Sequence, residues 1–190
     1  MIPWQAPKWV PKYIPRVPKQ KAALCVTPTP IQKWPLSITG SDDHPIQFYI
    51  KRDDLTGAAL TGNKVRKLEF LLSDAVEKKC DTIIAWGAST SNHCRATAVS
   101  SARLGLECHL LLTKEGDIDY SSGNITLAAA TGAKLYQMEN CSFAEADRRM
   151  NQLLLQLADQ GRKAYVIPRG GSSHVAIWVS FKGYNIILTI

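Results

Sequence analysis

Short apolar segments alternate with amphipathic segments along residues 46–168, and this alternation limits the possible folds more than any other feature. The apolar segments are IQFYIK (46–51), TIIAW (82–86), CHLLLT (108–113), AKLYQM (133–138) and AYVIP (164–168). Between them lie the helical patterns KVRKLEFLLSDAVEKK (64–79), NHCRATAVSSARL (92–104), NITLAAAT (124–131) and FAEADRRMNQLLLQLADQ (143–160). Strands that alternate with amphipathic helices are joined by right-handed crossovers. The sequence therefore predicts an α/β fold with a mostly parallel sheet.

Capping and stop residues mark several of the helix ends. Ser142 is followed three residues later by Glu145, which is the capping-box spacing at the start of a helix. Gly105, Gly132 and Gly161 follow helical patterns, where a glycine commonly ends the helix.

The composition allows a globular chain with a core of its own. Of the 190 residues, 45% are hydrophobic and 21% are charged, which suits one domain, or one domain and part of another. No segment approaches the roughly 18 consecutive apolar residues of a membrane helix, and the N-terminus lacks the apolar region of a secretory signal. We expect a soluble intracellular protein without a membrane partner, located in the cytoplasm, with mitochondria left open.

The five cysteines are odd in number and widely spaced. They show no metal-ligand spacing, and His93 has no second histidine or carboxylate at ligand distance along the sequence. We therefore expect reduced thiols and no metal.

The N-terminal region differs in composition from the rest of the chain. Eight prolines lie between Pro3 and Pro35, which predicts an extended arm because proline is excluded from helix interiors and central strands. The net charge of +7 also belongs to this arm, since six bases precede the first acid, Asp42. With interleaved tryptophan and tyrosine the arm could bind RNA. Aromatic residues of this kind more commonly pack an arm onto its own domain, so no nucleic-acid partner is expected.

Three loops rich in glycine, serine and asparagine lie at junctions between the predicted strands and helices. They are TGNK (61–64), GASTSNH (87–93) and RGGSSH (169–174). In parallel sheets, ligands bind at the carboxyl ends of the strands, where helix N-termini favour anions. The sequence therefore predicts the functional site at these loops.

The residues alone leave two interpretations open for each candidate. Lys64 lies beside Arg66 and Lys67, whose charges oppose protonation of its amine, so it is either a nucleophile or part of a solvated basic helix start. Ser91, Asn92 and His93 precede or open a helix, where they either hold an anion or act as a simple N-cap.

Two motifs resolve these alternatives by resemblance. The segments IKRDDLTGAALTGNKVRKLEFLLSDA, DTIIAWGASTSNHCRATAVSSARLGLECHLLL and AYVIPRGGSS resemble the D-cysteine desulfhydrase and 1-aminocyclopropane-1-carboxylate deaminase family. The resemblance covers about residues 46 to 173, and the pair GNKxRKLE and SNHxR is its most specific part. It implies a pyridoxal 5'-phosphate enzyme with the tryptophan-synthase-β type of fold, known as fold type II.

The resemblance also implies roles for individual residues. Lys64 matches the lysine that binds pyridoxal phosphate covalently and later moves the substrate's proton, and Asn63 belongs to the same cofactor-binding motif. Ser91 matches a serine that acts as nucleophile or proton-transfer group and contacts the substrate. Asn92 matches an asparagine at the cofactor ring and substrate, and His93 a position that binds the substrate carboxylate.

The implied reaction is the conversion of D-cysteine to pyruvate, hydrogen sulfide and ammonia by a lyase of amino-acid catabolism. The deaminases commonly have glutamine at the position of His93, so the histidine favours the desulfhydrase. Cyclopropane carboxylate deaminase and a catalytically incompetent truncated form are the alternatives. A small amino acid is the expected partner, with a homodimer in the complete enzyme.

The resemblance further implies four regions and a truncated C-terminus. These are a basic arm (1–45), the start of the larger cofactor domain with the lysine (46–64), a smaller α/β domain (65–165) and a return to the larger domain (166–190). The family's phosphate-binding loop and its partner for the pyridine nitrogen lie beyond this chain. The segment HVAIWVSFKGYNIILTI (174–190) differs from the family's continuation and predicts one or two apolar strands.

Overall fold

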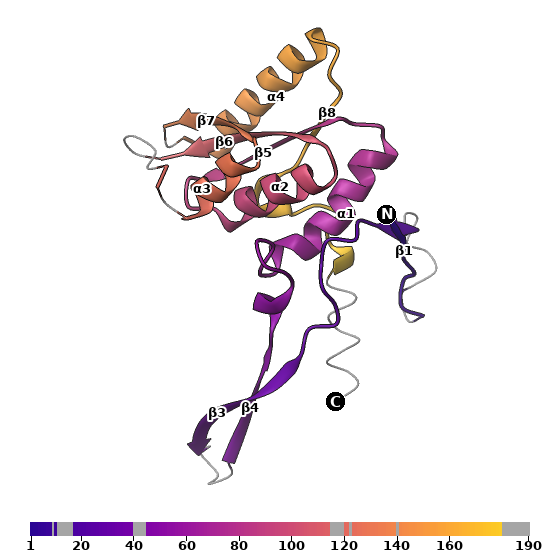
Figure 1. The fold of residues 1–190 in the computed structure, drawn as a ribbon, viewed down its shortest axis with the longest axis vertical. Helices are drawn as coiled ribbons and strands as arrows, with labels where there is room; N and C mark the ends of the chain where they lie inside the picture. Colours follow the sequence, from indigo (N-terminus) through magenta and orange to yellow (C-terminus); the bar gives the residue numbers. More distant parts are fainter. Residues whose placement is uncertain are drawn as a thin grey trace.

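The centre of the molecule is a four-stranded parallel sheet (Figure 1). The computed structural model describes residues 1–8, 10, 17–39, 45–114, 120–121, 123–139 and 141–179. The strands lie in the order β7 (Lys134–Met138), β6 (Glu107–Thr113), β5 (Thr82–Ala88) and β8 (Ala164–Val166). All three strand pairs are parallel, which confirms the predicted sheet.

Helices cover both faces of this sheet. They are α1 (Lys64–Glu77), α2 (Asn92–Arg103), α3 (Gly123–Ala130) and α4 (Phe143–Asp159). Ile83 and Ala85 of β5 pack in one core cluster with residues of α1, α2 and α3. Ile84 and Trp86 pack in a second cluster with α4. Successive residues of a strand point to opposite faces, so the continuous apolar run of β5 serves both cores.

The helix boundaries follow the predicted caps. Ser142 Oγ accepts a hydrogen bond from the Glu145 amide at 3.2 Å and begins α4. Gly105 and Gly161 follow α2 and α4 with φ of 69° and 75°, a left-handed conformation that glycine adopts at little cost.

The first part of the N-terminal arm packs against α1. Its strands β1 (Ile2–Pro3) and β2 (Gln20–Lys21) pair antiparallel. The Trp4 ring is buried and lies edge-on to Phe70 of α1, with 5.1 Å between ring centroids. This confirms the packing interpretation for Trp4, whereas Trp9 and Tyr13 lie outside the described residues.

The second part of the arm was not predicted correctly. Residues Ile31–Thr39 form strand β3, which pairs antiparallel with β4 (Pro45–Lys51), and this hairpin extends away from the sheet (Figure 1). Its register shifts between Trp34 and Ile38, a stretch that includes Pro35. A bulge in a two-stranded ribbon accommodates the missing N–H of proline, so the prolines of the arm did not forbid this strand. A short 3-10 helix, η1 (Asp53–Leu55), follows β4.

The predicted strands at the C-terminus are wrong for residues 174–179. After the short helix η2 (Arg169–Gly171), the backbone turns and becomes helical at residue 178. The Ile177 amide donates to the Ser173 carbonyl at 3.1 Å, and Ser173 Oγ accepts from the Ala176 amide. Ala176 and Trp178 are buried while Ile177 is 53% exposed, an alternation that a strand would also show. The backbone hydrogen bond from Ile177 to Ser173, and not the burial pattern, therefore identifies the helical turn. Residues 180–190 lie outside the described part of the chain.

None of the helices in the described ranges has the length and apolar character that a membrane crossing requires.

Candidate active site

The three predicted loops meet at the carboxyl edge of the sheet. Helix α2 follows β5, and η2 follows β8, the strand that pairs with β5. Helix α1 leads into the amino end of β5 and packs against both α2 and η2. Its first residue therefore lies at the opposite, carboxyl edge. The loops before Lys64, around Ser91 and around Gly170 thus come from distant parts of the sequence to one edge.

Two glycines in the turn after β8 bring Lys64 and His93 together. A Cβ atom built on Gly170 would lie 3.5 Å from Lys64 Nζ. A Cβ atom built on Gly171 would lie 3.2 Å from His93 Cε1 and 3.2 Å from Leu71 Cδ1. Both glycines have positive φ, 62° and 67°. The absence of side chains here allows the lysine amine and the imidazole to approach the same segment of backbone.

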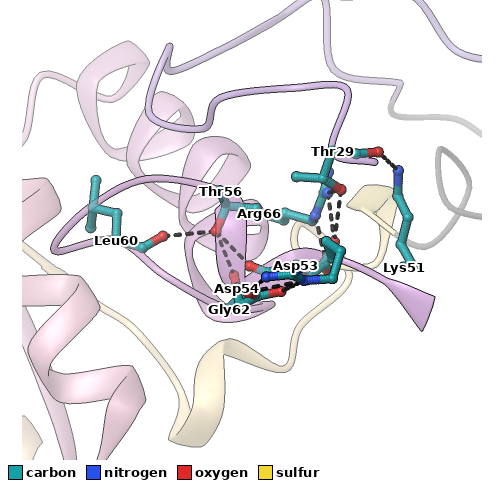
Figure 2. A network of polar contacts seen from close by, with 9 residues as sticks. Thr29, Lys51, Asp53, Asp54, Thr56, Leu60, Gly62 and Arg66 are labelled. Carbon is teal, nitrogen blue, oxygen red and sulfur yellow. Dashed lines mark hydrogen bonds and ion pairs between the residues drawn. The ribbon is translucent and has the colours of Figure 1, made fainter. Parts of the chain in front are cut away.

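A polar network fixes the loop that precedes Lys64 (Figure 2). Arg66 donates to both carboxylate oxygens of Asp53, at 2.7 and 3.1 Å, and also to Thr29 Oγ1. The Gly62 amide donates to the Asp53 carbonyl at 2.8 Å. The charge of Arg66 is paired with that of Asp53. The observed contacts of Arg66 hold the loop in place.

Asn63 and Lys67 flank this lysine differently. Asn63 occupies the N-cap position of α1 with no side-chain capping bond, and its side chain is exposed. Lys67 Nζ donates to the Gly170 carbonyl at 3.2 Å and to Ser172 Oγ at 3.1 Å. Burial, and secondly the charge of Lys64, lower the pKa of Lys67. Two amines thus lie near the glycine turn.

Ser91 caps α2, as one of the two interpretations predicts. Its Oγ accepts a hydrogen bond from the Cys94 amide at 3.2 Å. This bond uses a lone pair of the oxygen and leaves the hydroxyl proton available to another acceptor. Capping therefore does not exclude a role in binding or proton transfer.

Asn92 is exposed and is held by a residue that sequence reasoning missed. Asn124, at the start of α3, donates from Nδ2 to Asn92 Oδ1 at 3.1 Å and to the Thr90 carbonyl at 2.8 Å. Nothing in the local sequence marks Asn124, because the contact depends on how α3 packs beside α2.

His93 is buried and has no hydrogen-bond partner for either ring nitrogen within the described ranges. Its side chain is 3% exposed. Burial, then the charges of Lys64 and Lys67, lower the pKa of His93 from 6.5 to about 4. The imidazole is therefore neutral at pH 7 and offers one donor and one acceptor. Buried polar atoms without partners are rare and point to a bound group.

The depressed pKa of His93 makes stability depend on pH. Below pH 6.5 the unfolded chain takes up a proton at His93 that the folded chain refuses until about pH 4. Stability is therefore lost as the pH falls through this window, by about 3 kcal/mol between neutral pH and the lower end. Urea unfolding of the wild type and of His93→Gln at pH 7 and at about pH 4 measures this loss. The variant should lose less stability on acidification, and equal losses would contradict the assignment.

The carboxyl edge of the sheet thus holds the amine of Lys64 on a fixed loop and the neutral imidazole of His93, whose ring nitrogens have no partners in the described ranges. The N-termini of α1 and α2 lie beside them. A profile of the family described as pyridoxal-phosphate dependent enzyme matches residues 22–186. The chain belongs to this pyridoxal-phosphate enzyme family. The match begins before residue 46 and continues past residue 173, so the family region is longer than the motifs predicted.

Three known proteins are similar to most of this chain. A bifunctional D-cysteine desulfhydrase/1-aminocyclopropane-1-carboxylate deaminase of Arabidopsis thaliana, named as mitochondrial, is 39% identical over 93% of this chain and 44% of its own length. A D-cysteine desulfhydrase of Salmonella paratyphi B is 42% identical over 79% of this chain and 45% of its own length. The crystal structure of an ACC deaminase homologue matches with a TM-score of 0.77 and 33% identity, over 90% of this chain and 50% of that one. The chain thus spans about half the length of these relatives.

The residues at the carboxyl edge fit the family's cofactor. Pyridoxal phosphate carries an aldehyde, which needs an amine, and a phosphate, which cations and helix N-termini favour. Lys64 supplies an amine beside Gly170, Lys67 supplies a second cation, and His93 has two ring nitrogens without partners. A hollow of about 360 Å³ lies elsewhere, within the arm between residues 2–7 and residues 21–27, and includes none of these residues. The convergence of reactive groups, not this hollow, locates the candidate site.

Proposed function

We propose that this chain functions as a pyridoxal-phosphate-dependent carbon–sulfur lyase whose substrate is D-cysteine. The observation that carries the proposal is the approach of Lys64 Nζ and His93 to the same Gly170–Gly171 turn. Membership of the family supplies the cofactor. The overall reaction consumes water and converts D-cysteine to pyruvate, hydrogen sulfide and ammonia.

Lys64 is proposed to bind the cofactor covalently and to move protons. Bound pyridoxal phosphate supplies an electron-withdrawing ring that makes the α-proton of an attached amino acid acidic. Lys64 Nζ would be the general base that takes this α-proton. The bond from Cβ to sulfur then breaks, and the sulfur leaves as sulfide.

The start of α2 is proposed to orient the substrate. The neutral imidazole of His93 can donate one hydrogen bond to the substrate carboxylate, and the Ser91 hydroxyl retains its proton for the same purpose or for proton transfer. Asn63 and Asn92 are proposed to contact the cofactor, and Asn92 also the substrate. Asn124 supports this role by holding the Asn92 carboxamide. Fixing the carboxylate determines which α-substituent faces Lys64.

We favour D-cysteine over 1-aminocyclopropane-1-carboxylate as the substrate because of His93. At this position the sequence resemblance favours the desulfhydrase over the deaminase. The Salmonella relative is named D-cysteine desulfhydrase, and the Arabidopsis relative carries both names. The cyclopropane carboxylate deaminase is therefore the second candidate.

An assay with both substrates tests the proposal. The purified chain, supplied with pyridoxal phosphate, should release sulfide and pyruvate from D-cysteine in equal amounts. Release of 2-oxobutanoate from 1-aminocyclopropane-1-carboxylate, without sulfide from D-cysteine, would favour the deaminase. Bound cofactor without either product would favour a catalytically incompetent form and overturn the proposed activity of this chain.

Two further expectations from the sequence stay predictions. One is a cytoplasmic location, against which the mitochondrial name of the Arabidopsis relative offers an alternative. The other is a homodimer of the complete enzyme.

A further inference from the structure

Arg95 is a buried arginine for which the proposed reaction provides no role. It lies in α2, two residues after His93, and is 6% exposed. Its Nη1 donates to the Ala59 carbonyl and its Nη2 to the Thr61 carbonyl, the latter at 3.4 Å. Within the described ranges, no carboxylate forms an ion pair with it, and its Nε has no partner.

A buried guanidinium without a carboxylate is costly, because a charge taken from water needs compensation. Burial accordingly lowers the pKa of Arg95. Both of the carbonyl groups that it does hold belong to the loop immediately before α1. Thr61 is three residues from Lys64 in the sequence.

This loop is held from two sides. On one side, Arg66 and Asp53 form the ion pair of Figure 2, and Thr56 Oγ1 lies 2.9 Å from the Leu60 carbonyl. Those contacts come from η1, from α1 and from the loop itself. Arg95 is different, because it reaches the loop from α2, the helix that starts with Asn92 and His93.

We propose that Arg95 is a positioning residue, which fixes the loop of Lys64 relative to the start of α2 by holding the Ala59 and Thr61 carbonyls. The planar fork of a guanidinium can hold two carbonyls at once, whereas a lysine ammonium acts as a single point charge. The inference deepens the proposed function and rests on it only for the role of Lys64. The clasp between the two segments can be tested without cofactor.

Hydrogen exchange of the cofactor-free chain tests the clasp directly. In Arg95→Met, the amides of residues 57–63, including the Gly62 amide bonded to Asp53, should exchange at least about tenfold faster than in the wild type. Amides of α4 should be unchanged. Arg103→Met is the matched control, because Arg103 also lies in α2 and donates to a carbonyl, that of Leu24 at 3.2 Å, away from Lys64. Unchanged exchange at residues 57–63 in Arg95→Met would overturn the proposal.

Arg95→Lys covers the case in which the methionine variant does not fold. It keeps the charge and one donor, so exchange at residues 57–63 should lie between the wild type and full release of the loop. Exchange equal to the wild type would show that the two-carbonyl fork is not needed and would contradict the proposal.

Cofactor titration separates the clasp from the proposed function. The absorption band of lysine-bound cofactor should form about tenfold more weakly in Arg95→Met, with partial recovery in Arg95→Lys and none of this loss in Arg103→Met. Wild-type chain that forms no band would count against the proposed function, while the exchange rates would still decide whether Arg95 holds the loop. A normal band in a variant with a released loop would show that Arg95 does not position Lys64.

Discussion

Lys64→Ala should abolish the visible absorption band that the wild-type chain forms with pyridoxal phosphate. The band requires a covalent bond between the cofactor aldehyde and a lysine amine. Lys64 Nζ lies beside Gly170 and belongs to the lysine that the family motif assigns to this bond. Sulfide release from D-cysteine should fall by about a thousandfold or more, because the variant loses both the attachment point and the proposed base. Absorption spectra and a sulfide assay measure the two effects.

Lys78→Ala is the matched control for this prediction. Lys78 caps the other end of the same helix and pairs with Asp74 at an exposed position, at 2.7 Å. It should keep both the band and the activity. A band that survives in Lys64→Ala would assign the cofactor to another lysine.

Glu69→Ala should cost about 3–5 kcal/mol of unfolding free energy, since it breaks a buried ion pair and strands one partner. Glu69 and Lys21 are 3% and 5% exposed, and their side chains form an ion pair between α1 and the arm. Glu69 Oε1 also accepts hydrogen bonds from the Leu24 and Cys25 amides, at 3.3 and 3.1 Å. The substitution leaves a buried ammonium and two amide groups without this acceptor.

Urea unfolding followed by circular dichroism measures this loss. Glu69→Gln should lose less stability than Glu69→Ala, because the carboxamide oxygen can still accept from the two amides. Arg149→Ala breaks an exposed ion pair with Glu145 and should change stability by only about 0.5 kcal/mol. A loss below about 1 kcal/mol in Glu69→Ala would mean that this pair does not fix the arm.

Periodicity was sufficient to predict the sheet and its helices. Apolar runs such as the one in β5 contain enough buried side chains for both faces, and Ser142 and Gly161 mark where α4 begins and ends. Local interactions determine these features, so a local pattern detects them. Strand β4 was predicted, but strand β3 and its pairing with β4 were missed, as was the helical turn at residues 174–179. In both, tertiary packing or a bulge overrides the preference of the individual residues.

The candidate site was only partly predictable for the same reason. Lys64, Ser91, Asn92 and His93 were found through motifs, but their roles stay predictions. The approach of Gly170 to Lys64 depends on β8 pairing with β5, and strand order is not encoded in any local pattern. The ion pair between Arg66 and Asp53 joins residues that are separated in the sequence, so no local pattern predicts it either.

Some regional expectations also stay predictions. The proposed boundaries at residues 45, 64 and 165 separate parts of a larger and a smaller domain by resemblance alone. Lys64 is the first residue of α1, so one continuous helix joins this lysine to β5 of the four-stranded sheet.

Chemical trapping of the cofactor tests the central claim most directly. The chain is incubated with pyridoxal phosphate, reduced with borohydride and digested, and the modified lysine is identified by mass spectrometry. We predict that the phosphopyridoxyl group is found on Lys64, with little on Lys67 although its amine also lies near Gly170. Modification centred on Lys67, or spread evenly over the exposed lysines, would contradict the assignment of this edge of the sheet as a pyridoxal-phosphate site built around Lys64.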